Sequence, residues 1–420
     1  MRCRRQAAST VILYSVLCYN RLMIIRQGFK FRLDVNPEQD ARLRVLVGHA
    51  RFVWNQALAR CNDAYSAEDQ RVPRYETMAK WITAWKREPE TEWLTEAYTD
   101  NLQQKLKDLD AAWQRCFDPK LQAQRPRFKK KGRDRDSIRF VNFAKYCQLD
   151  SRRVKLPSKL GWIKFRQSRP IIGTIKNCTV GSEAGHWHIS FQTEREVSAP
   201  VHPAPAAWIG IDLGIARFAT LSDGTFTEPL GSFKRHQQAL AKAQRQLSRK
   251  VKFSSNWRKA KARIQHLQRR IANVRQDFLH KTSTRISQNH AMIVIEDLQV
   301  SNMSASAKGT VEVPGRNVRQ KTGLNRSILD QGWFEFRRQL EYKAGWAGGE
   351  VLAVPAHHTS QTCPACGHVS RDNRLTQAQF ACTDCGYENN ADVVGALNIL
   401  ARGIKTCAKG GTSPGSPVSA

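Results

Sequence analysis

A spacing of four cysteines constrains the fold of this chain most. They follow the pattern C-x2-C-x15-C-x2-C, at Cys363, Cys366, Cys382 and Cys385. Each pair sits on a tight turn, because Gly367 or Gly386 comes directly after it. Four thiolates complete a tetrahedral zinc shell and leave no position open for water. The spacing therefore predicts one structural Zn²⁺ in a ribbon over residues 359–388, in a reducing compartment.

The charge balance predicts a polyanionic partner. The chain has 68 Lys and Arg against 36 Asp and Glu, which gives a formal net charge of +32 over 420 residues. A compact fold tolerates such an excess more readily when a polyanion is bound, and nucleic acid is the commonest one. No apolar stretch is long enough to span a membrane, so we expect no membrane partner.

The periodicity divides the chain into two or three folded units. Residues 24–35 alternate as a strand does, and helical spacing follows from about residue 38 to about residue 117. Strand-like pieces resume over residues 154–193. The Pro-rich and Ala-rich segment 197–207 then predicts a domain boundary at about residue 205.

Beyond this connector, residues 207–224 predict two strands and a turn, which open an α/β domain. Between Lys234 and Arg285 there are sixteen Lys or Arg and one acid, Asp277, across two predicted helices broken near residues 253–256. An ordinary solvated helix mixes charges of both signs to gain i,i+4 pairs. This composition instead favours a phosphate-backbone partner.

Three acids stand at the ends of separate predicted elements. Asp212 lies inside a buried strand, Glu296 ends a second apolar strand, and Asp392 opens a helix that Gly403 is expected to close. Each has a simpler explanation: a buried ion pair, the start of a turn, and a helix N-cap, respectively. Together they can converge on one cleft, as a two-metal phosphoryl-transfer site requires.

The segments around these acids resemble the three RuvC motifs of the TnpB family, which insertion sequences encode and which is related to the type V CRISPR effectors. The three segments are GIDLG from Gly210, VIEDL from Val294 and NADVVGALNIL from Asn390. The resemblance extends over nearly the whole chain, through GFKFRL from Gly28, HARFVWNQAL from His49, PRFKKKGR from Pro126 and TCPACG from Thr362. One departure is Val394, where such proteins often have Asn.

The resemblance implies an α/β RNase H-like (RuvC) nuclease domain over residues 206–402, in which the first and fourth strands lie side by side. The zinc ribbon and a basic helical insertion over residues 234–285 interrupt it. An N-terminal β-barrel-like wedge, itself interrupted by a helical recognition region, would precede this domain. The implied bounds are 23–45 and 126–200 for the wedge and 46–125 for the helical region. The Gly, Ser and Pro content of the C-terminus predicts a disordered tail over residues 403–420, and Met23 opens a segment that begins a fold cleanly, so we expect residues 1–22 to be a non-native extension.

The resemblance also implies a transposon-associated, RNA-guided DNA endonuclease of the transposase class in the bacterial cytoplasm, at the nucleoid when it is bound to DNA. Asp212, Glu296 and Asp392 would be catalytic and would hold two Mg²⁺. Its partners would be a transposon-derived guide RNA and target DNA. Candidate backbone contacts are Arg127, Lys129, Lys130, Lys131, Arg133, Lys252, Arg258, Lys259 and Lys261.

Two alternatives remain open from the sequence. His186 and His188 form a His-hydrophobic-His triplet, as in single-strand transposases that use a tyrosine nucleophile, and a strand would place both on one face. The second alternative is a regulator or accessory protein of transposition that binds nucleic acid without cutting it. Loss of one of the three acids would favour that class, and all three are present.

Overall fold

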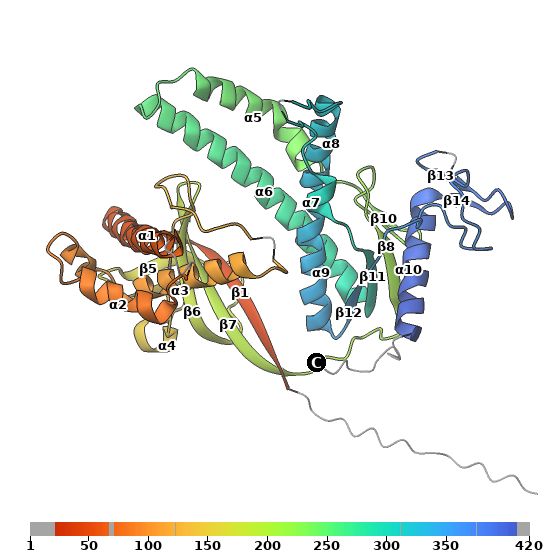
Figure 1. Ribbon diagram of the computed structural model, residues 1–420. Helices are drawn as coiled ribbons and strands as arrows, with labels where there is room; N and C mark the ends of the chain where they lie inside the picture. The colour runs from red at the N-terminus through yellow and green to blue at the C-terminus, as the bar shows by residue number, and fades with distance from the viewer. Residues whose placement is uncertain (1–21, 67–70, 122, 311, 375, 410–420) are drawn as a thin grey trace, which may run out of the picture.

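The computed structural model describes residues 22–66, 71–121, 123–310, 312–374 and 376–409. They form two lobes, residues 22–198 and residues 208–409, joined by the predicted connector (Figure 1). The extension predicted for residues 1–22 lies outside the described residues, except for Leu22. Among the described helices, none is long and apolar enough to cross a membrane.

The N-terminal lobe is built on a seven-stranded sheet with the order β2-β6-β7-β1-β5-β4-β3. The strands are β1 (Leu22–Asp34), β2 (Ser137–Phe140), β3 (Gln148–Asp150), β4 (Arg153–Leu156), β5 (Gly161–Arg166), β6 (Thr174–Glu183) and β7 (His186–Ser198). The first strand therefore pairs with strands that follow the helical region, in agreement with a β-rich part made of two chain segments. Closure of this sheet into a barrel stays a prediction.

The chain between β1 and β2 is helical, and these helices cover one face of the sheet. They are α1 (Pro37–Ser66), α2 (Tyr75–Trp85), the 3₁₀ helix η1 (Glu92–Glu96) and α3 (Thr99–Phe117), and a short α4 (Phe143–Tyr146) follows β2. The predicted boundary at residue 46 falls inside α1. The helix begins earlier because the Asn36 side chain accepts a hydrogen bond from the Gln39 amide (2.7 Å) and the Gln39 side chain accepts one from the Asn36 amide (3.2 Å).

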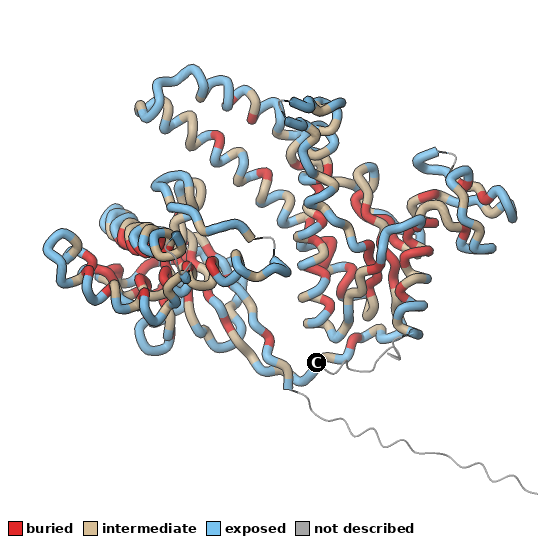
Figure 2. The backbone as a smooth tube through the Cα atoms, in the orientation of Figure 1, coloured by how far each residue is buried: buried red, intermediate tan, exposed pale blue. Residues whose placement is uncertain are grey.

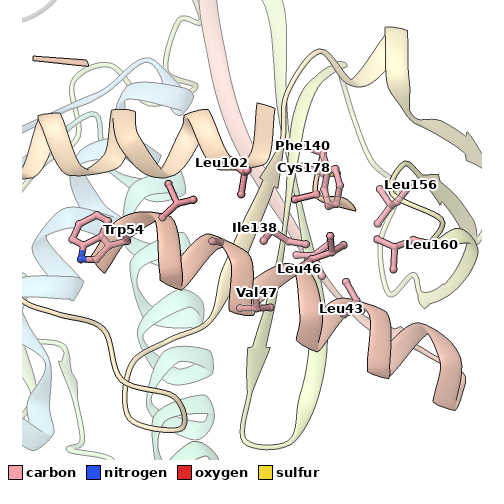
Figure 3. Packing of buried hydrophobic residues seen from close by; sticks show 14 of the residues in the cluster. Leu43, Leu46, Val47, Trp54, Leu102, Ile138, Phe140, Leu156, Leu160 and Cys178 are labelled. Atoms are coloured by element: carbon pink, nitrogen blue, oxygen red, sulfur yellow. The ribbon is translucent and has the colours of Figure 1, made fainter. Parts of the chain in front are cut away.

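The core of this lobe lies between α1, α3 and the sheet. Figure 3 shows Leu46 of α1 beside Ile138 of β2, and Leu43, Val47 and Phe140 belong to the same buried cluster. All five side chains are buried. Removal of this much apolar surface from water holds the helices against the sheet.

The C-terminal lobe contains a five-stranded sheet with the order β10-β9-β8-β11-β12. Its strands are β8 (Trp208–Asp212), β9 (Ala219–Leu221), β10 (Phe226–Thr227), β11 (Met292–Glu296) and β12 (Glu350–Val354). β8, β11 and β12 are parallel, whereas β9 and β10 run antiparallel to their neighbours. The first and fourth strands of this sheet, β8 and β11, thus lie side by side as expected.

The helices of this lobe flank the sheet and extend beyond it. They are α5 (Ser232–Ser248), α6 (Ser255–Asn289), α7 (Val300–Met303), α8 (Val318–Gln331), α9 (Trp333–Ala347) and α10 (Ala391–Lys409). The ribbon adds a small hairpin of β13 (Gln379–Ala381) and β14 (Glu388–Asn390). α5 and α6 project over the N-terminal lobe as a long hairpin, with the predicted break between them (Figure 1).

The last helix corrects one prediction. It passes through Gly403 and ends at Lys409, so the disordered tail predicted from residue 403 is wrong for residues 403–409. Gly403 does not end the helix. Its lack of a side chain instead leaves room for the Val294 side chain, which packs at that position. Residues 410–420 lie outside the described part of the chain.

The sheet of the C-terminal lobe is covered on both faces. Ile209, Ile211, Ile293 and Ile295 join a buried cluster with α6 and α9 on one face. On the other face, Val294 packs against α10. Figure 2 shows buried residues concentrated around this sheet, while the outer end of the α5–α6 hairpin and the ribbon are mostly exposed.

Two glycines allow α10 to lie directly on the sheet. A Cβ on Gly210 of β8 would come within 2.2 Å of the Ala396 carbonyl oxygen of α10. A Cβ on Gly403 would come within 2.4 Å of the Val294 side chain of β11. A larger residue at either position would push the helix away from the strands.

We predict that Gly210→Ala lowers the melting temperature by several degrees, because overpacking a close backbone contact costs about 1–3 kcal/mol. Gly323→Ala is the matched control, since Gly323 lies within α8 with no atom near its Cβ position. Alanine there should leave stability unchanged or raise it slightly. Equal melting temperatures for the two variants, measured by differential scanning fluorimetry, would contradict the close contact.

Candidate active site

Asp212 and Glu296 lie beside one another at the ends of two parallel strands. Ile211 of β8 is in register with Ile295 of β11, so the residues that follow are neighbours. Both isoleucines point toward α6 and α9. Because side chains alternate along a strand, Asp212 and Glu296 point to the opposite face, which α10 covers.

Asp392 approaches the same place from the first turn of α10. The helix is capped by Asn390, whose side-chain oxygen accepts hydrogen bonds from the amides of Asp392 (3.1 Å) and Val393 (3.4 Å). Asp392 is therefore not the N-cap. A Cβ on Gly395 would lie 3.2 Å from an Asp212 carboxylate oxygen, so that carboxylate rests against the start of α10. The fold thus brings the three acids to one end of the sheet.

Burial disfavours the charged forms of Asp212 and Glu296, and repulsion between the acids adds to this effect at Asp212. Burial, followed by the negative charges of Glu296 and Asp392, raises the pKa of Asp212 to about 7. Burial also raises the pKa of Glu296, against the opposing effect of a hydrogen bond from Thr359. Buried carboxylates that repel one another are stabilised by a bound cation.

The donor set fits a hard divalent cation. The three side chains offer carboxylate oxygens, which Mg²⁺ prefers. Among the described residues, only the four cysteines gather around a single point as one tight cluster. The three carboxylates do not form such a cluster.

The four cysteines of the ribbon are assembled as predicted. Their sulfur atoms all lie within 4.8 Å of one another, and the Sγ atoms of Cys363 and Cys385, like those of Cys366 and Cys382, are 3.6 Å apart. A Zn–S bond of about 2.3 Å implies a tetrahedral S–S separation of about 3.8 Å. The geometry therefore fits zinc.

The two cysteine turns have the same backbone geometry. The amide of Gly367 donates to the Cys363 carbonyl (3.0 Å), and the amide of Gly386 donates to the Cys382 carbonyl (3.0 Å). Both glycines have positive φ, +81° and +73°. Glycine adopts this conformation without steric cost, which explains its place after each pair.

Comparison with known proteins identifies the family. The chain is 54% identical over 384 residues to a protein of Escherichia coli (strain K12) named "Putative RNA-guided DNA endonuclease InsQ". The matched region is 91% of this chain and 94% of that protein. The chain belongs to the TnpB family. A "Putative RNA-guided DNA endonuclease" of Streptomyces pristinaespiralis is 34% identical over 394 residues, 92% of this chain and 91% of the relative.

Further matches agree with TnpB membership. Residues 188–307 match a family described as "Probable transposase", and residues 333–399 match the Cas12f1-like TNB domain. The cryo-EM structure of a Cas12f1-sgRNA-target DNA complex has the same overall fold, with a TM-score of 0.51 and 13% identity over 90% of this chain and 98% of that chain. Residues 23–70 match a family described as a helix-turn-helix domain, yet the described residues 23–66 form mainly the strand β1 and the single helix α1.

The departure from the TnpB pattern at Val394 has a packing explanation. Val394 is buried with Phe380 and Cys363 between α10 and the ribbon. It therefore faces the zinc-binding hairpin, and an apolar side chain at this position joins the two elements.

Three residues near the acids were missed by sequence reasoning. The Thr359 hydroxyl donates to Glu296 (2.8 Å), and the Asn398 amide donates to the Thr359 carbonyl (2.8 Å). The Arg374 guanidinium, from the ribbon, lies 3.7 Å from the Asp392 carboxylate. Asn398 lies within the segment NADVVGALNIL, but only the folded arrangement reveals its contact and those of Thr359 and Arg374.

The predicted basic contacts divide into two groups. Most are exposed: Arg127, Lys130, Lys131, Arg133, Lys252, Arg258 and Lys259. Lys129 instead lies over the Trp54 ring, 3.5 Å from its centroid, and burial lowers its pKa to about 8. Lys261 is half-buried and donates to the Gly132 carbonyl (3.1 Å). Lys129 and Lys261 therefore make contacts within the protein in addition to carrying positive charge.

A basic cleft between the lobes was not predicted from the sequence. It has a volume of about 960 Å³ and is lined by β1, α6 and α9. Its cationic side chains include Arg26, Lys30, Arg169, Arg338 and Lys343. They come from distant parts of the chain, so no local charge run marks them.

The histidine triplet does not form a metal centre. His186 packs against His266 of α6 with ring centroids 5.7 Å apart. Burial and the nearby Lys30 and Arg269 lower the pKa of His188 to about 4. Within the described residues, neither histidine belongs to a group of three or more potential ligands. The tyrosine-transposase alternative therefore has no support from the geometry.

We predict that Cys382→Ser reduces bound zinc from one ion per chain to near zero, because three thiolates no longer close the shell. Plasma mass spectrometry of the purified protein measures this. Cys116→Ser, on α3 and outside the ribbon, is the control and should retain one zinc. Full zinc content in the Cys382 variant would show that the ribbon does not bind the ion.

We predict that Asp212→Asn raises the melting temperature at pH 8 in buffer without divalent cations. The folded-state pKa of Asp212 is about 7, above its ordinary 3.8, so the fold loses stability as the pH rises from about 4 to about 7 and does not regain it above pH 7. The gain should disappear near pH 4, where the carboxyl is protonated in the folded protein. Asp277→Asn, which changes an exposed acid of α6, should show no such pH dependence. A variant less stable than the parent at pH 8 would contradict the repulsion.

Proposed function

We propose that this protein is an RNA-guided DNA endonuclease that hydrolyses DNA phosphodiester bonds at Asp212, Glu296 and Asp392. The observation that carries the proposal is the meeting of three carboxylates from β8, β11 and α10, with the pKa of Asp212 raised by burial and by its two acidic neighbours. The relatives named as RNA-guided DNA endonucleases match nearly the full length of the chain, which supports the same activity here.

In this proposal the three acids hold two Mg²⁺. When bound, the ions would activate the attacking water and stabilise the leaving oxygen. Asp212 interacts electrostatically with both other acids and would hold the ions together with them. The Thr359 hydroxyl would orient the Glu296 carboxylate through its hydrogen bond. Because Asn390 caps α10, the Asp392 carboxylate is not needed as the cap and is available to bind a cation.

Arg374 would orient the substrate in this site. Its guanidinium lies at the edge of the acidic cluster, 3.7 Å from Asp392. A guanidinium there can donate to a phosphoryl oxygen of the strand being cut. The four-cysteine zinc site would hold the segment that carries Arg374 close to α10.

The partners follow from charge and from the relatives. The fold resembles that of a Cas12f1 protein solved with guide RNA and target DNA. A guide RNA of transposon origin would pair with the target, and the basic cleft between the lobes would contact the backbone of the hybrid. The non-cleaving alternative has no observation in its favour, because all three acids converge.

We predict that Asp212→Ala abolishes DNA cleavage, with a loss of at least about a hundredfold, while RNA binding persists. The assay uses ribonucleoprotein purified with its copurifying RNA, a plasmid that carries the matching target, and Mg²⁺. Sequencing of that RNA defines the target.

Asp297→Asn is the matched control, because Asp297 directly follows Glu296 but is paired with Arg337 on α9. It should retain at least half of the cleavage rate. Cleavage by the Asp212 variant, or by no variant including the parent, would refute the nuclease assignment.

A further inference from the structure

The tip of the α5–α6 hairpin presents an aromatic side chain to solvent. Phe253 lies in the turn between the helices, and 71% of it is exposed. The small core of the hairpin is formed by Leu240, Ala243 and Ile264, so Phe253 is not needed there. An exposed phenylalanine gains nothing from the hydrophobic effect until a partner covers it.

The backbone at this position is strained. Phe253 has φ of +68°, a left-handed conformation that is unusual for a bulky residue. Such conformations are energetically costly and concentrate at functional sites. Ser254 then caps α6 by accepting a hydrogen bond from the Trp257 amide (3.1 Å), so the turn has a defined shape.

The ring of Phe253 belongs to a small platform. Its centroid lies 5.4 Å from the ring of Trp257, with the planes tilted by 53°. The Lys261 ammonium lies 5.2 Å from the centroid of the same Trp257 ring. Aromatic rings next to a cation bind the face of a nucleobase without regard to its identity.

Positive charge surrounds this platform on the chain and in space. Residues 249–261 contain no acid, and their basic members are Arg249, Lys250, Lys252, Arg258, Lys259 and Lys261. The hydrogen bond from Lys261 to the Gly132 carbonyl adds the basic segment 127–133 of the N-terminal lobe. Two basic segments far apart in the sequence thus meet at one surface with an aromatic centre.

We infer that Phe253 and Trp257 form a stacking site for an unpaired base of the guide RNA, and that the surrounding lysines and arginines contact its phosphates. The inference deepens the proposed function and rests on it for the identity of the RNA. It adds a base-binding role for Phe253 that the charge pattern alone did not indicate.

The position of the tip favours RNA over the DNA strand that is cut. α6 has 35 residues, so at about 1.5 Å per residue the helix is about 50 Å long. Its far end leads into β11, which ends at Glu296, whereas the tip lies at the opposite end of the hairpin (Figure 1). A strand must reach the acids to be cut, and the guide must be held away from them.

The test measures binding by fluorescence anisotropy on full-length protein freed of nucleic acid in high salt. The probes are labelled oligouridine and oligothymidine of about twenty nucleotides, long enough to cover a single-strand site. Phe253→Gly should weaken oligouridine binding about tenfold or more, with an unchanged slope of log affinity against log salt, because no phosphate contact is lost. Glycine adopts the positive φ without strain, so this variant should fold at least as well as the parent.

Two further variants separate stacking from general hydrophobic contact. Phe253→Tyr should bind as the parent does, since it keeps the aromatic face. Val251→Ala, at a side chain that is 79% exposed on the same tip, should also be unchanged. An equal loss with Val251→Ala, or no loss with Phe253→Gly, would overturn the stacking site.

The probes also separate RNA from DNA and the inference from the proposed function. A loss confined to oligothymidine would overturn the assignment to guide RNA. Because the assay requires no cleavage, a protein that binds RNA through Phe253 but cuts nothing would leave the stacking site standing and remove only the nuclease. Intact cleavage with no dependence of RNA binding on Phe253 would remove the stacking site and leave the nuclease assignment standing.

Discussion

The close packing of α10 against β8 and β11 is the constraint on which the C-terminal lobe depends. The helix can lie on the strands only because Gly210 and Gly403 have no side chains. That contact covers the second face of the sheet, and it also sets how far the first turn of α10 stands from the strand ends. The geometry of Asp212, Glu296 and Asp392 is therefore a consequence of packing at residues that carry no charge and take no part in chemistry.

The ribbon extends this constraint to the other side of the acids. Val394 buries the contact between α10 and the cysteine turns. Asn398 of the same helix binds the carbonyls of Thr359 (2.8 Å) and Thr362 (2.7 Å), and Thr359 in turn binds Glu296. The ribbon and the position of a candidate catalytic acid are thus linked through three successive contacts, from the ribbon to Val394 on α10, from Asn398 on α10 to Thr359, and from Thr359 to Glu296. Loss of the metal would unfold the ribbon and would also free the Glu296 carboxylate from its fixed position.

Much of the candidate site could be predicted because it follows from short-range rules. Alternation along a strand places Asp212 and Glu296 on one face once Ile211 and Ile295 are assigned to the other, and the cysteine spacing defines the ribbon without any tertiary information. The roles of Thr359 and Arg374 depend on long-range packing, so no local pattern announces them. The end of α10 was misjudged for a similar reason: Gly403 resembles a helix stop in sequence, but in the fold it makes room for Val294.

The strand order of the N-terminal lobe bears on how the protein is made. β1 is the first described element to leave the ribosome, yet it lies in the middle of its sheet, between β7 and β5. Until both partners have been synthesised, its apolar side chains and its backbone edges have no sheet to join. Assembly of this sheet is consequently delayed until the chain has been synthesised past Ser198. The helical region leaves the ribosome before that point, while β1 is still unpaired. Residues 1–198 hold 38 Lys and Arg against 21 Asp and Glu, an excess of 17 positive charges, and electrostatic repulsion between such nascent chains would oppose self-association during this interval.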